Sequence, residues 1–308
     1  MSIWKDKELR SQFPEGAKLI TLNEGETSVV KKTINNQGLL IINEETNPSG
    51  SWKDRGTSFK LTQLLSDNIN EAVLFSSGNA LISLLTYCNE LKLDFKVHCV
   101  VSEKVNKIKL GIIQSLVKDK QHTLVITSQP KKKAIEISAQ LKIPNLRISL
   151  DNEIVKGYWS LGFEINSLIK NEDNSSVNIY CPASSGTALV GLVQGIFMKV
   201  NSESKMPRIF VCQTDALHTF DNENKVIEKN SLADAIVDTV GLRSGQVQKI
   251  VRETNGEIYS ISNGELKRAK EFCIESGLQK YSYNSLLSIA GYLRGSTSRI
   301  NICVASGR

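Results

Sequence analysis

The sequence predicts an α/β protein with mostly parallel sheets, because apolar strand-like runs alternate with segments of helical period. A strand that is covered on both faces shows a continuous apolar run rather than an alternating one. Seven short runs, rich in β-branched residues and bounded by polar or turn residues, fit this description: Leu39–Ile42, Ala72–Phe75, Phe95–Val101, Thr123–Thr127, Val177–Cys181, Ile209–Cys212 and Ile300–Ala305. We expect each of them to form a buried strand.

Eight longer segments repeat their apolar residues at the helical period. They are Ser58–Leu65, Ala80–Leu91, Val105–Leu116, Ala134–Leu141, Leu161–Ile169, Ala188–Val200, Glu265–Glu275 and Ser285–Leu293. In open α/β sheets, ligands bind at the carboxyl ends of the strands, where loops lead into helices. The loops that follow residues 42, 75, 181 and 303 therefore form the candidate site.

Length and composition exclude several classes of protein. The chain has 308 residues, of which 40% are hydrophobic and 23% are charged. This predicts two folded domains, or one domain with an added lobe, rather than a disordered chain. No apolar run approaches the ~18 residues of a membrane span, and the polar N-terminus lacks the apolar core of a secretory signal. We expect a cytoplasmic protein without a membrane partner.

Charge and metal-ligating residues exclude further functions. The net charge of +6 is spread along the chain, which predicts no nucleic-acid partner. The six cysteines form no CxxC pair, and the chain has three histidines. We expect the cysteines to be reduced core thiols, and we expect no metal site.

Lys53 is the candidate nucleophile in the first of the four loops. Asn47–Gly50 favours a turn, and Ser51 is a candidate N-cap, which places Lys53 in the first turn of a helix. The positive end of the helix dipole disfavours a charged amine there, and a Schiff-base nucleophile has to be a neutral amine. A solvated helix start is the alternative interpretation of this Lys-Asp-Arg triplet.

The other three loops carry small and hydroxyl residues. Ser76–Ala80 and Pro182–Gly191 each join a predicted strand to a helix, so they can offer backbone N–H groups and hydroxyls to an anion. Pro182–Gly191 is neither a Walker motif nor a GxGxxG dinucleotide fingerprint. Ser306 follows the last strand. Ordinary capped turns and a terminal loop are the alternatives for these segments.

The order of these motifs resembles that of one enzyme family. Glu45–Gly56 is similar to the lysine motif of the tryptophan-synthase-β-like (fold type II) pyridoxal-phosphate (PLP) enzymes. Ser76–Ala80, followed by Ser83, resembles their asparagine loop in the variant typical of threonine synthases. Thr21–Thr27 resembles the early Leu-x-Glu-Gly-x-Thr segment of the same enzymes. The resemblance extends from about Trp4 to the last residue.

The resemblance implies a role for each candidate residue. Lys53 would hold PLP as a Schiff base and shuttle protons, Asn79 would hydrogen-bond the PLP phenolic oxygen, and Ser306 would hydrogen-bond the pyridine nitrogen. The residues that would cradle the PLP phosphate are Ser184, Ser185, Gly186 and Thr187. The residues that would bind the substrate α-carboxylate are Ser76, Ser77 and Ala80.

The resemblance also implies the architecture, a two-domain, three-layer αβα fold with PLP at the domain interface. Residues 52–155 would form the smaller α/β domain, and residues 1–51 with 156–308 would form the larger one. The partner would be a small amino-acid substrate, and a homodimer is an expectation from the resemblance alone.

The implied function is that of a PLP-dependent lyase of threonine biosynthesis, which converts O-phosphohomoserine and water to threonine and phosphate. Lys109 and Arg147 are candidate clamps for the substrate phosphate. Two alternatives stay open: a serine/threonine ammonia-lyase or β-replacement enzyme, and a non-catalytic PLP-binding regulatory protein. Three departures motivate the alternatives: a phosphate loop that is poorer in glycine, Tyr281–Asn284 in place of a Glu-Pro segment, and a chain that ends at Arg308.

Overall fold

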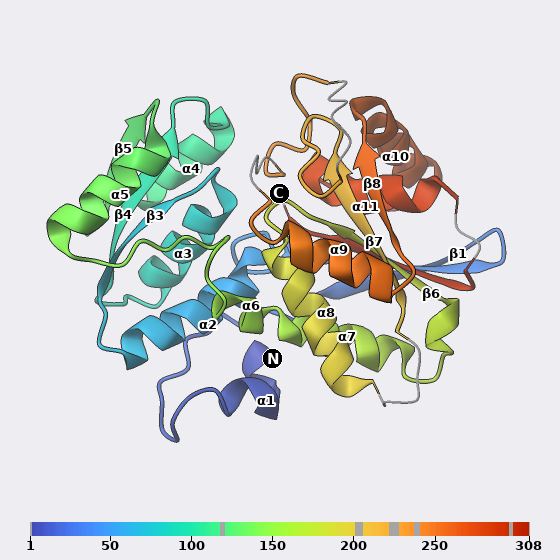
Figure 1. The fold of residues 1–308 in the computed structure, drawn as a ribbon, viewed down its shortest axis with the longest axis horizontal. Helices are drawn as coiled ribbons and strands as arrows, with labels where there is room; N and C mark the ends of the chain where they lie inside the picture. Colours follow the sequence, from blue (N-terminus) through green and yellow to red (C-terminus); the bar gives the residue numbers. More distant parts are fainter. Residues whose placement is uncertain are drawn as a thin grey trace. The chain divides into compact units, whose positions relative to one another are not determined.

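The computed structural model describes residues 2–117, 121–200, 206–221, 228–236, 241–295 and 298–307. The chain divides into two compact units (Figure 1). Unit 1 comprises Met1–Gly25 and Asn47–Gly157, and unit 2 comprises Glu26–Thr46 and Tyr158–Arg308. None of the helices in the described ranges has the length and apolar character needed to cross a bilayer.

Unit 1 is built on a parallel sheet in the order β3 (Glu71–Phe75), β4 (Lys96–Ser102) and β5 (Thr123–Thr127). Alternate residues of β3 belong to different cores. Ala72 and Leu74 pack with α2, α3 and α4, whereas Val73 packs with α5. The bounds of these helices are Lys53–Ser66, Asn79–Glu90, Lys107–Leu116 and Pro130–Leu141. Because helices cover both faces, the strands read as continuous apolar runs.

The N-terminal segment belongs to unit 1 because it packs on α2. It contains η1 (Ile3–Lys5) and α1 (Lys7–Arg10). The buried Trp4 indole donates through Nε1 to the Ile20 carbonyl at 2.9 Å and to Ser58 Oγ at 3.0 Å, and its ring stacks on Phe59. Residues 1–25 and 47–51 therefore fall in unit 1 in this division, whereas the resemblance assigned them to the larger domain. The short helix α6 (Ile154–Gly157) closes unit 1 and packs on α2.

Unit 2 contains, among the described residues, a six-stranded sheet in the order β1–β2–β9–β6–β7–β8. Only the β1–β2 pair of this sheet is antiparallel in those residues. The strands are β1 (Ser28–Ile34), β2 (Gln37–Asn43), β6 (Val177–Pro182), β7 (Arg208–Thr214), β8 (Glu257–Ile261) and β9 (Ile300–Ala305). The helices are α7 (Trp159–Ile169), α8 (Thr187–Lys199), α9 (Ser244–Glu253), α10 (Asn263–Glu275) and α11 (Tyr283–Leu293), with 3-10 turns at Glu44–Thr46 and Asn174–Ser176.

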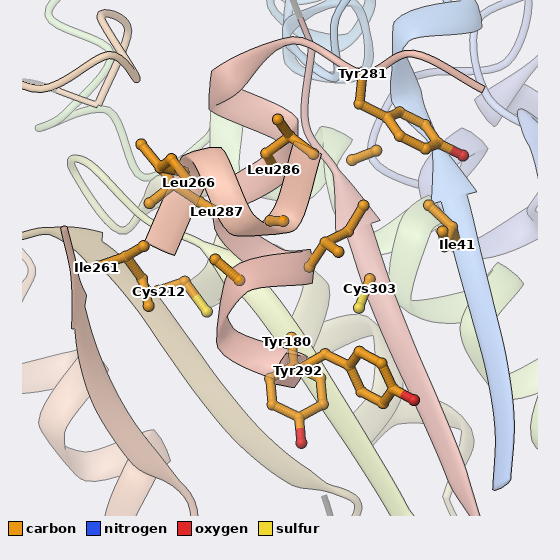
Figure 2. Close-up of a cluster of buried hydrophobic side chains, with 14 of the residues drawn as sticks. Ile41, Tyr180, Cys212, Ile261, Leu266, Tyr281, Leu286, Leu287, Tyr292 and Cys303 are labelled. Carbon is orange, nitrogen blue, oxygen red and sulfur yellow. The ribbon is translucent and has the colours of Figure 1, made fainter. Parts of the chain in front are cut away.

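Helices α10 and α11 cover one face of this sheet and form the core drawn in Figure 2. Cys212 of β7 and Cys303 of β9 lie there among apolar side chains that include Leu286 and Leu287 of α11. Helix α9 packs on β7 and β8, while α8 packs on both α7 and α9 (Figure 1). All six cysteines are buried and free of disulfides, as predicted, and burial raises the pKa of the Cys212 thiol to about 12.

The predicted α/β class is confirmed, and all seven predicted strands and all eight predicted helices are present. The expectation that every one of these strands is buried is wrong for β5, an edge strand whose residues are half-buried or exposed. Besides the short helices α1 and α6 and the 3-10 turns, three longer elements of the described ranges were missed, and each of the three buries few residues. Strand β1 is a mostly exposed edge, β8 is half-buried, and α9 buries only Val247 among its side chains. The expectation that Ser51 caps α2 is wrong in detail. Trp52 occupies the N-cap position, and Ser51 Oγ accepts the Lys53 N–H at 3.4 Å.

Candidate functional site

Lys53 is the first residue of α2, directly after the turn that the sequence predicts. Gly50 closes this turn by donating its N–H to the Asn47 carbonyl at 2.8 Å, and it has a φ of +86°, a conformation that glycine adopts without strain. Lys53 is half-buried, and its Nζ lies 5.6 Å from the centroid of the buried Trp52 ring. The amine is therefore held at a helix N-terminus beside an aromatic ring.

Asp54, the next residue, ties the lysine helix to the asparagine loop. Its Oδ2 accepts the Ser49 N–H at 2.7 Å, and its Oδ1 accepts the hydroxyl of Ser49. The same Oδ1 accepts from Ser83 Oγ, on α3, at 2.5 Å. Ser83 lies one turn after Asn79, so this carboxylate joins the segment that carries Lys53 to the segment that carries Asn79. The sequence analysis did not single out Asp54 as a positioning residue.

A second buried carboxylate, Glu24, lies near Asp54. Glu24 Oε2 accepts from Tyr87 Oη at 2.7 Å and from Thr21 Oγ1 at 2.9 Å. The pKa of Asp54 is raised from its ordinary value of 3.8 to about 6. Burial is the main cause and the charge of Glu24 adds to it, while the hydrogen bonds from Ser49 and Ser83 act in the opposite direction. Asp54 thus carries a negative charge at neutral pH only at a cost in stability.

We predict that Asp54→Asn flattens part of the pH dependence of stability. Between about pH 4 and pH 6 the carboxyl is protonated in the folded chain and ionised in the unfolded chain, so the free energy of unfolding falls as the pH rises through this window. The loss relative to Asp54→Asn is expected to reach about 2–3 kcal/mol, from a shift of roughly two pKa units. Denaturant titrations of both proteins from pH 4 to 7 measure it.

The control for this prediction is Asp67→Asn, at the exposed C-cap of the same helix. It is expected to follow the wild-type profile. Parallel profiles for wild type and Asp54→Asn would show that Asp54 does not titrate in this range.

The asparagine loop follows β3 and leads into α3, whose first residue is Asn79. Ser76 Oγ accepts the Gly78 N–H at 3.1 Å, Ser77 is exposed, and Ala80 is buried in the first turn of α3. Gly78 has a φ of +135°, so an L side chain would be strained there. The sequence-predicted carboxylate-binding residues therefore share one loop at a helix N-terminus.

Lys109 of α4 lies against this loop. A Cβ placed at Gly78 would stand 2.8 Å from Lys109 Cδ and 3.2 Å from Lys109 Cβ. The lysine is 7% exposed, so most of its length is covered by protein. Arg147, the other predicted clamp, is exposed. The structure therefore places Lys109 beside the Ser76–Ala80 loop.

The phosphate loop of unit 2 joins β6 to α8. Gly186 is the N-cap of α8 and adopts a left-handed conformation, with a φ of +82°. Ser185 Oγ lies 3.0 Å from Thr187 Oγ1 and accepts the Thr187 N–H at 3.4 Å. Ser185 and Thr187 are buried and Ser184 is half-buried. The loop thus presents hydroxyls and backbone N–H groups at the positive end of a helix dipole.

Arg243, which the sequence analysis missed, lies across the same loop. Its Nε lies 3.3 Å from Thr187 Oγ1, and a Cβ at Gly186 would stand 3.3 Å from Arg243 Cβ and 2.8 Å from Val247 Cγ2. Arg243 immediately precedes α9, a short amphipathic helix that the sequence analysis did not single out. Only the packing of α9 beside α8 brings the arginine to the loop.

Ser306 lies at the carboxyl end of β9, the strand next to β6. It is buried, and its Oγ donates to the Asn284 carbonyl at 3.5 Å. Ser282 caps α11 and donates its Oγ to the Gly307 carbonyl at 2.6 Å, and its N–H donates to Glu45 Oε1 at 2.9 Å. The divergent Tyr281–Asn284 segment therefore supplies the cap that holds the residues around Ser306.

The predicted site residues thus fall into two sets. Unit 1 brings together Lys53 and the asparagine-loop residues Ser76, Ser77, Asn79 and Ala80. Unit 2 brings Ser184–Thr187 and Ser306 to the carboxyl ends of two neighbouring parallel strands.

Comparison with known proteins decides the family. The sequence profile of the family described as pyridoxal-phosphate dependent enzymes matches residues 20–294, most of the chain. This chain belongs to that family. PLP is its cofactor. No curated protein sequence matches this PLP enzyme.

Three solved structures of PLP enzymes illustrate the likeness in fold. Maize serine racemase is 14% identical, with a TM-score of 0.76 over 99% of this chain and 93% of that one. The O-acetylserine-dependent cystathionine β-synthase from Helicobacter pylori is 16% identical, with a TM-score of 0.74 over 92% and 93%. The fungal L-serine ammonia-lyase from Rhizomucor miehei is 14% identical, with a TM-score of 0.71 over 92% and 94%. The predicted tryptophan-synthase-β-like fold class is confirmed.

The side chains present fit the cofactor. A dianionic phosphate suits a loop in which Gly186 leaves no room for a side chain and in which Ser185, Thr187 and Arg243 all carry hydrogen-bond donors. A buried hydroxyl at Ser306 can hydrogen-bond a ring nitrogen, and Lys53 offers an amine for the aldehyde. Bound PLP supplies an electron sink for bonds at the substrate α-carbon.

Proposed function

We propose that this PLP enzyme is a lyase resembling threonine synthase, which converts O-phosphohomoserine and water to threonine and phosphate. Overall, the Cγ–O bond to phosphate breaks and Cγ gains a proton, while Cβ loses one proton and gains the hydroxyl of water. In the proposal, Lys53 binds the cofactor, and Asn79, Ser306 and the Ser184–Thr187 loop orient it. Ser76, Ser77 and Ala80 bind the substrate α-carboxylate.

The observation that carries this proposal is the position of Lys109. O-Phosphohomoserine has two anionic ends, a carboxylate and a phosphate, whereas serine and threonine have one. The Ser76–Ala80 loop provides donors for a carboxylate, and Lys109 adds a buried cationic side chain directly against Gly78 of that loop. A cation in a water-poor position attracts a phosphate far more strongly than an exposed one does. This favours a doubly anionic substrate.

The proposed catalytic work of the chain lies with Lys53. After substrate binding, its amine removes the proton from Cα and then a proton from Cβ as the phosphate leaves Cγ, and it later returns protons at Cγ and Cα. A positioned general base or acid typically contributes 10²–10⁴-fold to the rate of such a transfer. Asp54 accepts hydrogen bonds from Ser49, in the turn before Lys53, and from Ser83, on the helix that Asn79 opens. It therefore fixes the position of the lysine segment relative to the Ser76–Ala80 loop.

The test is product identity together with one substitution. The PLP-loaded protein is supplied with O-phosphohomoserine, and phosphate and threonine are measured. Lys109→Ala is expected to lower kcat/KM for O-phosphohomoserine by ~10–100-fold, the equivalent of one strong charge-assisted contact. Any activity with L-serine is expected to change less than about threefold, because serine lacks the phosphate.

The matched control is Lys107→Ala, on the exposed face of the same helix, which removes the same charge two residues away. It is expected to leave both activities unchanged. A keto acid and ammonia from serine or threonine, without phosphate release, would instead assign an ammonia-lyase. An unchanged kcat/KM in Lys109→Ala would remove the phosphate clamp from the proposal, and inactivity with every amino acid would favour the non-catalytic alternative.

A further inference from the structure

Arg243 is a buried guanidinium at the loop that joins β6 to α8. The residue is 5% exposed. Its Nε lies 3.3 Å from Thr187 Oγ1, and its Nη1 donates to Gln246 Oε1, on α9, at 3.1 Å. Its Cβ passes over Gly186, where a side chain would collide with Val247. The guanidinium is thus fixed between the start of α9 and the phosphate loop.

The helices around this arginine reinforce its charge. Helix α8 begins at Thr187 and α9 begins at Ser244, and the two helices are in contact. Both therefore direct the positive end of a dipole toward the region of Arg243, and neither N-cap residue caps its helix with a side-chain hydrogen bond. Burying a cation among partial positive charges is unfavourable, and an anion that binds nearby stabilises it.

The hydroxyls of the loop form a chain that ends at the guanidinium. Ser185 Oγ lies 3.0 Å from Thr187 Oγ1, which lies 3.3 Å from Arg243 Nε. A guanidinium offers five donors in a planar fork, and it binds phosphate oxygens in pairs. A phosphate at the loop would therefore accept from the hydroxyls and from the arginine together.

We propose that Arg243 binds the phosphate of PLP and supplies the fixed positive charge of its binding loop. Thr187 and Gln246 hold the guanidinium in place, so little side-chain entropy is lost when the phosphate binds. The proposal concerns the cofactor alone and does not depend on which reaction the protein performs.

The test compares two ligands that differ only in the phosphate. The dissociation constants of PLP and of pyridoxal are measured by absorbance titration of the cofactor-free protein, for wild type, Arg243→Gln and Arg243→Lys. Arg243→Gln is expected to weaken PLP binding by ~30-fold or more and to change pyridoxal binding less than about twofold. Arg243→Lys keeps the charge but loses the fork, so an intermediate loss is expected for PLP alone.

The control is Arg252→Gln, an exposed arginine near the end of the same helix, which is expected to bind both ligands as wild type does. Equal weakening of PLP and pyridoxal in Arg243→Gln would overturn the proposal, because a residue that only supports the fold would not distinguish them. Unchanged PLP binding would overturn it as well. If Arg243→Gln does not fold, as judged by circular dichroism, the PLP-to-pyridoxal ratio of Arg243→Lys decides.

Discussion

Replacing Lys53 with alanine is expected to abolish turnover and to leave PLP without a covalent link to the chain. Lys53 is the half-buried first residue of α2, after a turn that Asp54 fixes through Ser49. Under the proposed mechanism, alanine removes both the nucleophile that holds the cofactor and the group that moves protons at Cα. Because these effects act on the same step, a loss of at least about 10⁴-fold in kcat is expected.

Two measurements check this prediction. Reduction of the PLP-loaded protein with borohydride, followed by mass spectrometry of the denatured chain, detects a covalent adduct on Lys53 in wild type and none in Lys53→Ala. Initial rates with the assigned substrate give the loss of turnover. Residual turnover within about tenfold of wild type would move the catalytic role to another residue.

Lys60→Ala is the matched control on the same helix. Lys60 lies two turns after Lys53 and forms a 2.6 Å ion pair with Asp151. Its loss is expected to reduce stability by about 1 kcal/mol or less and to leave the covalent adduct and the turnover intact.

Substituting Gly195 or Gly162 with alanine is expected to give a large loss of stability. A Cβ at Gly195 of α8 would stand 2.2 Å from the Trp159 carbonyl oxygen, and a Cβ at Gly162 of α7 would stand 2.2 Å from the Leu192 carbonyl oxygen. Both obstacles are helix backbone, which cannot rotate away as a side chain can. The helices must therefore separate, at an expected cost of roughly 3 kcal/mol or more.

The same two substitutions are expected to displace the phosphate loop. Helix α8 starts at Thr187, so moving α8 away from α7 moves Ser185 and Thr187 relative to Arg243. The midpoint of denaturant unfolding is expected to fall in both variants, and the PLP dissociation constant is expected to rise in the molecules that remain folded. Chemical denaturation and cofactor titration measure the two effects separately.

Gly111→Ala is the control for both variants. Gly111 also lies within a helix, α4, but a Cβ there would meet nothing within 4 Å. Alanine is expected to stabilise that helix by ~0.5–1 kcal/mol, because it restricts the unfolded chain and propagates a helix better than glycine does. If Gly195→Ala matched Gly111→Ala in stability, the close approach of α7 and α8 would not exist in solution.

The sequence was most informative where a single local cause dominates. Runs such as Val177–Cys181 and Ile300–Ala305 are buried strands within about one residue of those bounds, because helices on both faces of a parallel sheet require continuous apolar residues. The edge strand β1 and helix α9 were not predicted, and each has few buried side chains.

Some residues of the candidate site were predictable from local sequence, and others were not. Lys53, Asn79 and the Ser184–Thr187 loop follow strands and open helices, and that placement is a local property of strand-to-helix junctions. The sequence showed Asp54 only as part of the Lys-Asp-Arg triplet. Its hydrogen bond with Ser83 depends on how α2 packs on α3.

The sequence by itself thus determined the α/β class, the order of the buried strands, and the loops that carry the candidate PLP residues. Only the tertiary structure decided which distant charges join those loops: Lys109 against Gly78 and Arg243 across Thr187. The reason is physical. Each helix or strand repeats its buried residues at its own period along the sequence, so the sequence shows them. Contacts between elements depend instead on how helices pack, and the residues that then face each other are far apart in sequence.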